Sequence, residues 1–264
     1  MSSIVARKVK FEFPDALDDV LPGAAPIDET YLVAFSLTMP YLEPYLIRTF
    51  RACADRIADV ELAADLRGFI AQEAQHFQNH RRVNEIIRAQ LGPTVAAELQ
   101  RIEDRLDADY RRCSEHKSMR FNLQYAEGFE AMTCAMAMTF FDRAAAGVVS
   151  ADGRFGAWQQ LWAWHAAEEV EHRTVAFAVH EHLCGGWARR AVGAACAQWH
   201  FQRYITRLQK VLLASQGLPR RAHLPGWLRD GRGRYLRTFL PGYDPAAIDP
   251  GPIAAMILAG YSGA

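Results

Sequence analysis

The chain has 264 residues, and 50% of them are hydrophobic, which is enough to fill a sizeable core in one large domain or two small ones. Lys and Arg together number 30, as do Asp and Glu, so the zero net charge excludes wholesale nucleic-acid binding and leaves only local patches. No apolar stretch of about 18 uncharged residues occurs, which argues against a membrane-spanning helix.

The start of the chain and its cysteines indicate where the protein works. The first residues, MSSIVARKVKFEF, contain no apolar core of a signal peptide. The five cysteines are odd in number and lack metal-type spacing, so they predict free thiols in a reducing compartment. We therefore expect a cytoplasmic protein. Residues 1–26 alternate weakly and contain Pro14 and Pro22, which predicts an extended arm.

Helical periodicity begins at residue 27 and predicts a helical bundle over 27–183. In the first segment, 27–57, two prolines predict a kink or a restart near Tyr41. After that point apolar residues alternate at spacings of four and three, the pattern of an inward-facing stripe in a bundle. Glu43 occupies the first position of this stripe.

The second helical segment spans 61–90 and ends at Gly92-Pro93. Its apolar stripe is interrupted by three polar residues, Glu73, His76 and His80. The charged stretch 94–117 predicts a further helix that connects the halves of the bundle.

Two more segments complete the predicted bundle. The third spans 120–146 and the fourth spans 155–183. Their stripes carry five polar residues with a ligand atom, namely Glu127, Glu130, His165, Glu169 and His172. Residues 187–215 predict a covering helix in which arginines mix with aromatic side chains, and the proline-rich remainder to 264 predicts short helices that wrap the bundle. No strand pattern and no Gly/Ser linker appears, so we predict one all-α domain over 1–264.

The carboxylates on these stripes predict a metal centre. Residues three apart on a helix share a face, so each Glu-x-x-His pair can bind one ion together. Burying ionised carboxylates without partners is very costly, and two divalent cations would neutralise them. The predicted ligands are Glu43, Glu73, His76, Glu130, Glu169 and His172. This combination is that of ferritin-like four-helix bundles with a di-metal carboxylate centre. Carboxylate and imidazole ligands favour iron, with Mn or Zn as alternatives, and the lack of thiolates argues against structural zinc.

Three candidates near the predicted ligands remain open. Glu127 is either a second ligand or a base outside the ligand shell, and we favour Glu130 as the ligand from that helix. His80 and His165 each lie one turn from a predicted ligand, as an extra ligand, a donor to a ligand or a core histidine. These three are the candidates for proton transfer. Glu168 and Glu171 lie off the stripe, and we expect them on a solvated face.

The stretches GFIAQEAQHFQNHRRVNE and WHAAEEVEHRTVAF resemble a bacterial family of predicted metal-dependent hydrolases. The resemblance extends from VARKVKFEF near the start to FLPGYDP near the end. The family motif QE-x-x-H-x-x-x-H is matched by Gln72, Glu73, His76 and His80. The motif WH-x-x-EE-x-EH is matched by Trp164, His165, Glu168, Glu169, Glu171 and His172. The family's third-helix glutamate precedes a small segment with a threonine, which indicates Glu130 before Thr133.

From these patterns we expect an enzyme with two divalent ions, iron first, of the oxidase or oxygenase type, acting on a small apolar substrate. The family name favours the alternative, a metal-dependent hydrolase that uses a metal-activated water. A non-catalytic ferritin-like metal-binding protein is the third alternative. We expect no nucleic-acid partner, and a homodimer is compatible with the sequence. Contact with a membrane surface is the weaker expectation, because the covering helix carries many arginines where relatives are more apolar.

Overall fold

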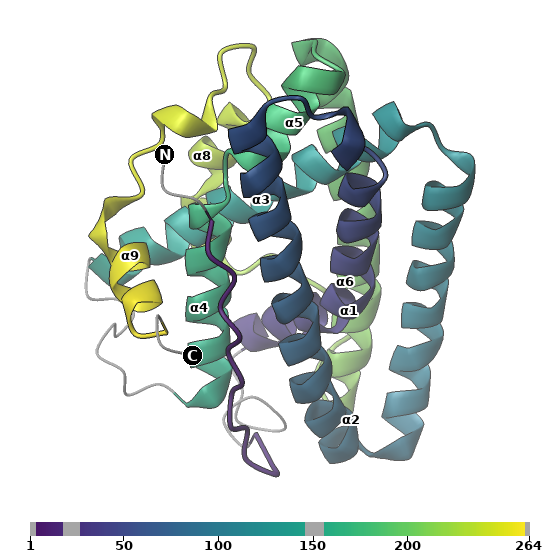
Figure 1. The fold of residues 1–264 in the computed structure, drawn as a ribbon. Helices are drawn as coiled ribbons and strands as arrows, with labels where there is room; N and C mark the ends of the chain where they lie inside the picture. The colour runs from purple at the N-terminus through teal and green to yellow at the C-terminus, as the bar shows by residue number, and fades with distance from the viewer. Residues whose placement is uncertain (1–3, 18–26, 146–155, 262–264) are drawn as a thin grey trace.

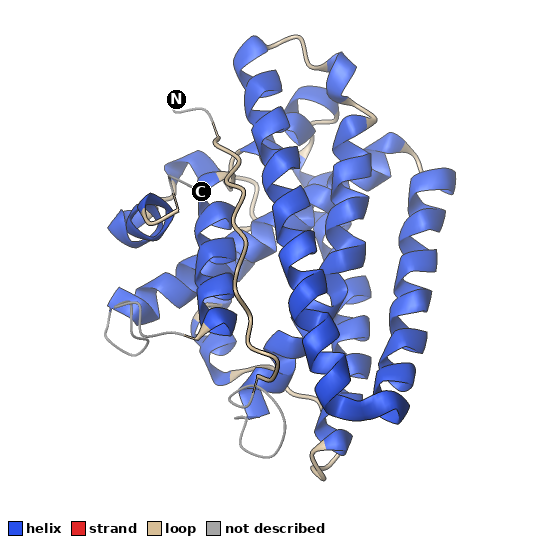
Figure 2. Ribbon diagram, turned by 60° about the horizontal axis from the view of Figure 1, so that its bottom comes forward, coloured by secondary structure: helices blue, strands red, loops and turns tan. Residues whose placement is uncertain are grey.

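The computed structural model describes residues 4–17, 27–145 and 156–261. Within these ranges all regular secondary structure is helical and no strand is present, which confirms the all-α prediction (Figure 2). Residues 4–17 form no helix and run as an extended arm between α4 and the first half of α2 (Figure 1). This agrees with the predicted arm, whose remainder, 18–26, lies outside the described residues.

The first helix, α1 (Ile27–Arg51), continues through Pro40 and Pro44 without an interruption. Figure 1 shows it bending between its first and second parts, so the prolines produce a bend and not a restart. A short 3₁₀ turn, η1 (Ala54–Arg56), follows. The helix is therefore shorter at its end than the predicted segment 27–57.

The second helix, α2 (Val60–His116), consists of two antiparallel halves. Asp59 caps its start, because its side chain accepts hydrogen bonds from the backbone of two residues in the first turn. The halves meet at Gly92, whose φ of 78° and ψ of 167° lie outside the helical region and favour glycine. The predicted end of the segment at Gly92-Pro93 is thus a sharp reversal of the chain.

The third helix, α3 (Met119–Ala145), agrees closely with the predicted segment 120–146. The predicted fourth segment, 155–183, is instead two helices, α4 (Ala157–Glu171) and α5 (Val175–Leu183). The break comes at 172–174, where Arg173 donates a hydrogen bond to the Val170 carbonyl at the end of α4. Arg173 also donates to the carbonyl of Pro245 in the tail, so contacts outside the local sequence stabilise this break.

The covering helix, α6 (Trp187–Ser215), has the predicted bounds and packs closely on α3. A Cβ atom on Gly128 would lie 2.2 Å from the Cα of Ala194, and one on Gly193 would lie 2.4 Å from the Cβ of Gln124. The two helices can approach this closely only because each has a glycine, which lacks a Cβ atom, at the contact. Both glycines are buried.

The tail contains the short helices α7 (Gly226–Asp230), α8 (Arg232–Arg237) and α9 (Gly251–Ala259), with the 3₁₀ turn η2 (Pro245–Ala247) between the last two. These pieces wrap the outside of the longer helices, as predicted (Figure 1). One continuous cluster of buried apolar side chains draws on the arm, on α1 to α6 and on α9. Among the described residues, no helix is both long and apolar enough to cross a membrane.

Candidate metal centre

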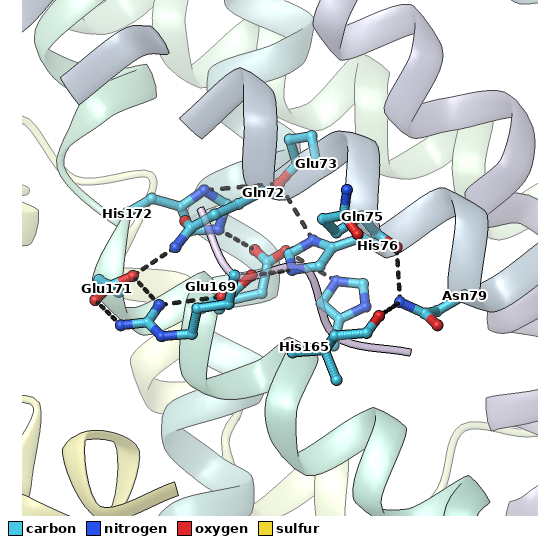
Figure 3. A network of polar contacts seen from close by, with 12 residues as sticks. Gln72, Glu73, Gln75, His76, Asn79, His165, Glu169, Glu171 and His172 are labelled. Carbon is cyan, nitrogen blue, oxygen red and sulfur yellow. Dashed lines mark hydrogen bonds and ion pairs between the residues drawn. The ribbon is translucent and has the colours of Figure 1, made fainter. Parts of the chain in front are cut away.

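The six predicted ligands converge inside the helical core. Glu43 comes from α1, Glu73 and His76 from the first half of α2, and Glu130 from α3. Glu169 lies on the last turn of α4, and His172 lies in the break that follows it. All six are buried, with at most 4% of each residue exposed. Figure 3 shows His76 of α2 beside His165 of α4, with Glu73 and Glu169 close to them.

Two groups of ligand atoms can be distinguished in this cluster. Glu73, Glu130, Glu169 and His172 each offer one ligand atom, and these atoms lie within 4.8 Å of one another. The Nε2 of His172 lies 3.6 Å from Oε2 of Glu169 and 3.9 Å from Oε2 of Glu130, while its Nδ1 lies 3.6 Å from Oε1 of Glu73. This group could hold one metal ion.

The second group consists of Glu43, His76 and His165, again with ligand atoms within 4.8 Å of one another. The Nε2 of His165 lies 3.8 Å from Oε1 of Glu43 and 3.0 Å from Oε1 of Glu169. The Nδ1 of His76 lies 3.4 Å from Oε1 of Glu73 and 4.0 Å from Oε1 of Glu169. Glu73 and Glu169 thus face both groups, so the two groups adjoin through these carboxylates.

A short chain of hydrogen bonds determines which nitrogen of His165 faces the cluster. The Nδ1 of His165 lies 2.8 Å from Nε2 of His80, whose Nδ1 lies 2.8 Å from the hydroxyl of Ser36. The Ser36 hydroxyl donates its hydrogen bond to Asn84, so it accepts a hydrogen bond from the Nδ1–H of His80. The Nε2 of His80 then accepts a hydrogen bond from the Nδ1–H of His165. The Nε2 of His165 then carries a lone pair.

Two lone pairs therefore meet where Nε2 of His165 faces Oε1 of Glu169 at 3.0 Å. Burial lowers the pKa of His165 to about 4, and the nearby His76 adds to this effect, so a second proton is not expected on this ring. A cation between the two atoms would make this contact favourable. Burial also lowers the pKa of His80, which keeps the hydrogen-bonded pair of imidazoles neutral.

Several buried ligand atoms of the cluster have no hydrogen-bond partner among the described residues. They are both oxygens of Glu43, both oxygens of Glu130, Oε1 of Glu73, Nδ1 of His76 and both ring nitrogens of His172. Leaving a buried polar atom unpaired costs about 1–3 kcal/mol, and more for charged groups. So many unpaired atoms in the two adjoining groups fit a pair of bound cations.

The pKa shifts of these groups also fit a site that binds cations. Burial raises the pKa of Glu43 well above its ordinary value, and repulsion from Glu73 adds to the rise. Burial and repulsion from Glu169 do the same to the pKa of Glu130. Burial alone would lower the pKa of His172, but the charge and hydrogen bonding of Glu169, together with the charge of Glu73, outweigh it and raise that pKa. Raised pKa values favour protonation of these groups when no cation is bound, because protons and metal ions compete for the same lone pairs.

Glu168 lies next to this cluster, which contradicts the expectation of a solvated face. Its side chain is fully buried, and its Oε2 lies 3.0 Å from Nε2 of His76. Its other oxygen accepts a hydrogen bond from Arg7 of the extended arm at 3.1 Å. A carboxylate on the outer nitrogen of a histidine fixes the ring so that the other nitrogen faces the ligand position. The pKa of His76 is raised because the carboxylates of Glu168 and Glu73 outweigh the effect of burial.

Glu171 is also held by the arm, although its side chain is 25% exposed. It accepts hydrogen bonds from both terminal nitrogens of Arg7 and from Gln72 (Figure 3). The expectation failed for both glutamates because the arm covers this face of α4. Helical periodicity carries no information about a segment that packs from elsewhere in the chain. For the same reason, helical periodicity does not predict the contact in which Thr133 of α3 donates to Oε2 of Glu169 at 2.5 Å.

The structure does not place Glu127 with either group of ligand atoms. It is buried beneath α6, where Oε1 accepts a hydrogen bond from Arg190 at 3.1 Å. Burial raises the pKa of Glu127 to about 7, and the positive charge of Arg190 limits the rise. Arg190 also donates to the carbonyl of Leu240, so this ion pair ties α3 and α6 to the tail.

Comparisons with known proteins agree with this picture. The model of a family described as predicted metal-dependent hydrolase matches residues 5–249. No curated protein and no solved structure matches the chain. The family match includes the arm, both Glu-x-x-His motifs and the covering helix, and it spans well over half of the chain. The chain therefore belongs to the predicted metal-dependent hydrolase family.

Proposed function

We propose that this protein is an enzyme whose cluster binds two divalent ions. The observation that supports the proposal is the lone-pair contact between His165 and Glu169, with unpaired buried ligand atoms around it. His165, His76 and Glu43 would hold one ion, and His172 and Glu130 the other. Glu73 and Glu169, which face both groups, would serve both ions. Carboxylate and imidazole ligands suit iron, manganese or zinc.

Hydrolysis is the reaction that we propose first, because the family to which the chain belongs is described by that activity. Bound divalent ions would supply a water of lowered pKa for hydrolysis or, if they are iron, electrons for the reduction of oxygen. We assign His80 a positioning role. It is fully buried together with its partners Ser36 and Asn84, so the chain of hydrogen bonds orients His165 and offers no exposed end for a proton.

Oxygen activation is the second candidate, and the depth of the cluster favours it. The ligand residues are almost inaccessible, and aromatic rings surround their histidines. Phe69 packs on His172 with ring centroids 4.7 Å apart, and Trp164 meets His76 at 4.9 Å. Excluding water in this way strengthens electrostatic interactions and protects reactive oxygen chemistry from side reactions. The same exclusion slows the entry of water that hydrolysis requires.

The decisive experiment compares two loaded forms of the full chain. Metal-free protein is loaded anaerobically with iron(II) or with zinc, and bound metal is measured by elemental analysis. The zinc form is assayed on ester, amide and phosphoester substrates, and the iron form is exposed to oxygen while its optical spectrum is followed. Hydrolysis by the zinc or iron form supports the first proposal, whereas oxygen consumption without hydrolysis supports the second.

Two variants make this test specific to the cluster. Glu169→Ala removes a carboxylate that faces both groups and should abolish metal binding and either activity. Glu171→Gln is the matched control, because this residue touches Arg7 and Gln72 but none of the ligand atoms. If the wild-type chain retains no metal after loading, the proposal of a metal-dependent enzyme is wrong.

A further inference from the structure

A cavity lies on the side of α3 that faces away from the metal centre. It has a volume of about 630 Å³ and is walled by α3, α6, the loop before α7, and α7 and α8. Met132, Ala135, Met136 and Thr139 line it from one face of α3, at spacings that share a helix face. Glu130 and Thr133, which reach the metal cluster, lie on the other face of the same helix. We call this cavity the α3/α6 pocket.

Most of the wall surface of the α3/α6 pocket is apolar, and its two tyrosine hydroxyls have hydrogen-bond partners. Tyr31 donates a hydrogen bond to Gln202 at 3.2 Å, and Tyr235 donates to Gln198. Both hydroxyls are thus bonded to glutamine oxygens that also line the pocket, and the amide nitrogen of Gln198 donates to the carbonyl of Gly128. The walls therefore offer a ligand little besides apolar surface, which favours a hydrocarbon group.

The rim of the α3/α6 pocket combines exposed apolar side chains with positive charge. Trp199, Leu224 and Leu236 line it although 65%, 49% and 59% of each residue is exposed. Contiguous exposed apolar side chains of this kind mark a binding surface. Arg229 and Arg232 also line it, and neither has an ion-pair partner among the described residues. No carboxylate is among the lining residues.

We propose that the α3/α6 pocket binds a single long-chain anionic amphiphile, with its hydrocarbon chain inside and its carboxylate or similar headgroup at Arg229 and Arg232. The volume lies within the range of about 300–1,000 Å³ that holds small ligands. The apolar wall matches the chain, and the two arginines match the headgroup. Because the site is a cavity and not a flat face, it fits one inserted hydrocarbon chain better than it fits the surface of a membrane. This inference is independent of the proposed metal chemistry, because the site lies on the opposite side of α3.

The first test measures binding of saturated fatty acids from octanoate to tetradecanoate by calorimetry, below their micelle concentrations. Affinity should rise about threefold to fourfold per methylene, the fold-change that about 0.8 kcal/mol per buried CH₂ gives, until the chain fills the cavity. Dodecyltrimethylammonium should bind more weakly than dodecanoate. Equal affinity for the anionic and the cationic amphiphile would overturn the assignment of the headgroup site.

Variants locate the binding. Ala195 lines the pocket from an exposed position on α6, so Ala195→Trp should fill the cavity and reduce dodecanoate affinity by about tenfold or more. The control is Ala188→Trp, an exposed residue of the same helix that does not line the cavity. Arg229→Gln with Arg232→Gln should weaken dodecanoate binding and leave dodecanol binding unchanged. Arg237→Gln, on α8 but outside the lining, should change neither.

Two other occupants give different results and would contradict the proposal. If vesicles with anionic lipid bind the protein but monomeric dodecanoate does not, the surface contacts membranes. If neither binds and Ala195→Trp instead shifts the mass in analytical ultracentrifugation, the pocket is a contact between two copies of the chain. Circular dichroism of every variant checks that the fold is retained.

Discussion

Replacing Glu168 tests whether this carboxylate positions His76 for metal binding. The carboxylate of Glu168 is fully buried between Nε2 of His76, at 3.0 Å, and Arg7, at 3.1 Å. Glu168→Leu removes both contacts at similar volume. Losing such an outer partner of a histidine ligand lowers metal affinity about 10- to 100-fold, or about 1.4–2.7 kcal/mol. The value of about 1.5–3 kcal/mol for one hydrogen bond to a charged group gives the same magnitude.

The assay is competition between the protein and a chelator of known affinity, with zinc as the probe ion. Glu168→Gln should lose less, about threefold to tenfold, because its amide oxygen still accepts from His76 but the charge is gone. Glu171→Leu is the control, since Glu171 contacts Arg7 and Gln72 but no histidine. Unchanged affinity in Glu168→Leu, or an equal loss in Glu171→Leu, would refute the positioning role of Glu168.

Three further predictions follow from the same geometry. Metal-free protein should lose thermal stability as pH rises above about 4.5. The pKa values of Glu43 and Glu130 are raised above this ordinary value, so their contribution to stability is complete below it and is lost as pH rises through the folded-state values. Metal-loaded protein should lack this loss, as calorimetry at several pH values will show. Arg190→Ala should destabilise the fold by about 3 kcal/mol in urea unfolding at pH 8, because it leaves Glu127 buried without its partner. The metal content should stay unchanged, and a loss of metal would contradict the placement of Glu127 outside the metal centre. Gly128→Ala should cost about 1–3 kcal/mol by forcing α3 from α6, and an unchanged melting temperature would mean that the helices are less close than described.

Local sequence patterns were sufficient to predict the all-α fold and the faces on which the candidate ligands lie. The stripe positions of Glu73, His76 and Glu169 follow from a spacing of three or four residues, which any helix converts into a shared face. The chain reversal at Gly92 follows from a residue type that tolerates positive φ, next to a proline. These features depend on neighbours in the sequence, so they could be predicted without the fold. The ferritin-like arrangement of the bundle stays a prediction from the ligand pattern.

Only the tertiary structure decided which residues surround those ligands. Glu168 lies beside His76 under Arg7, a residue 161 positions away in the chain. Glu127 shares a helix with Glu130, but it faces Arg190 of α6 instead of the cluster. The break that places His172 at the cluster is stabilised by Arg173 bonding to the tail. Helical periodicity reports which face of a helix is buried, but the partner on that face comes from a distant segment, and contacts between distant segments form only when the chain is folded.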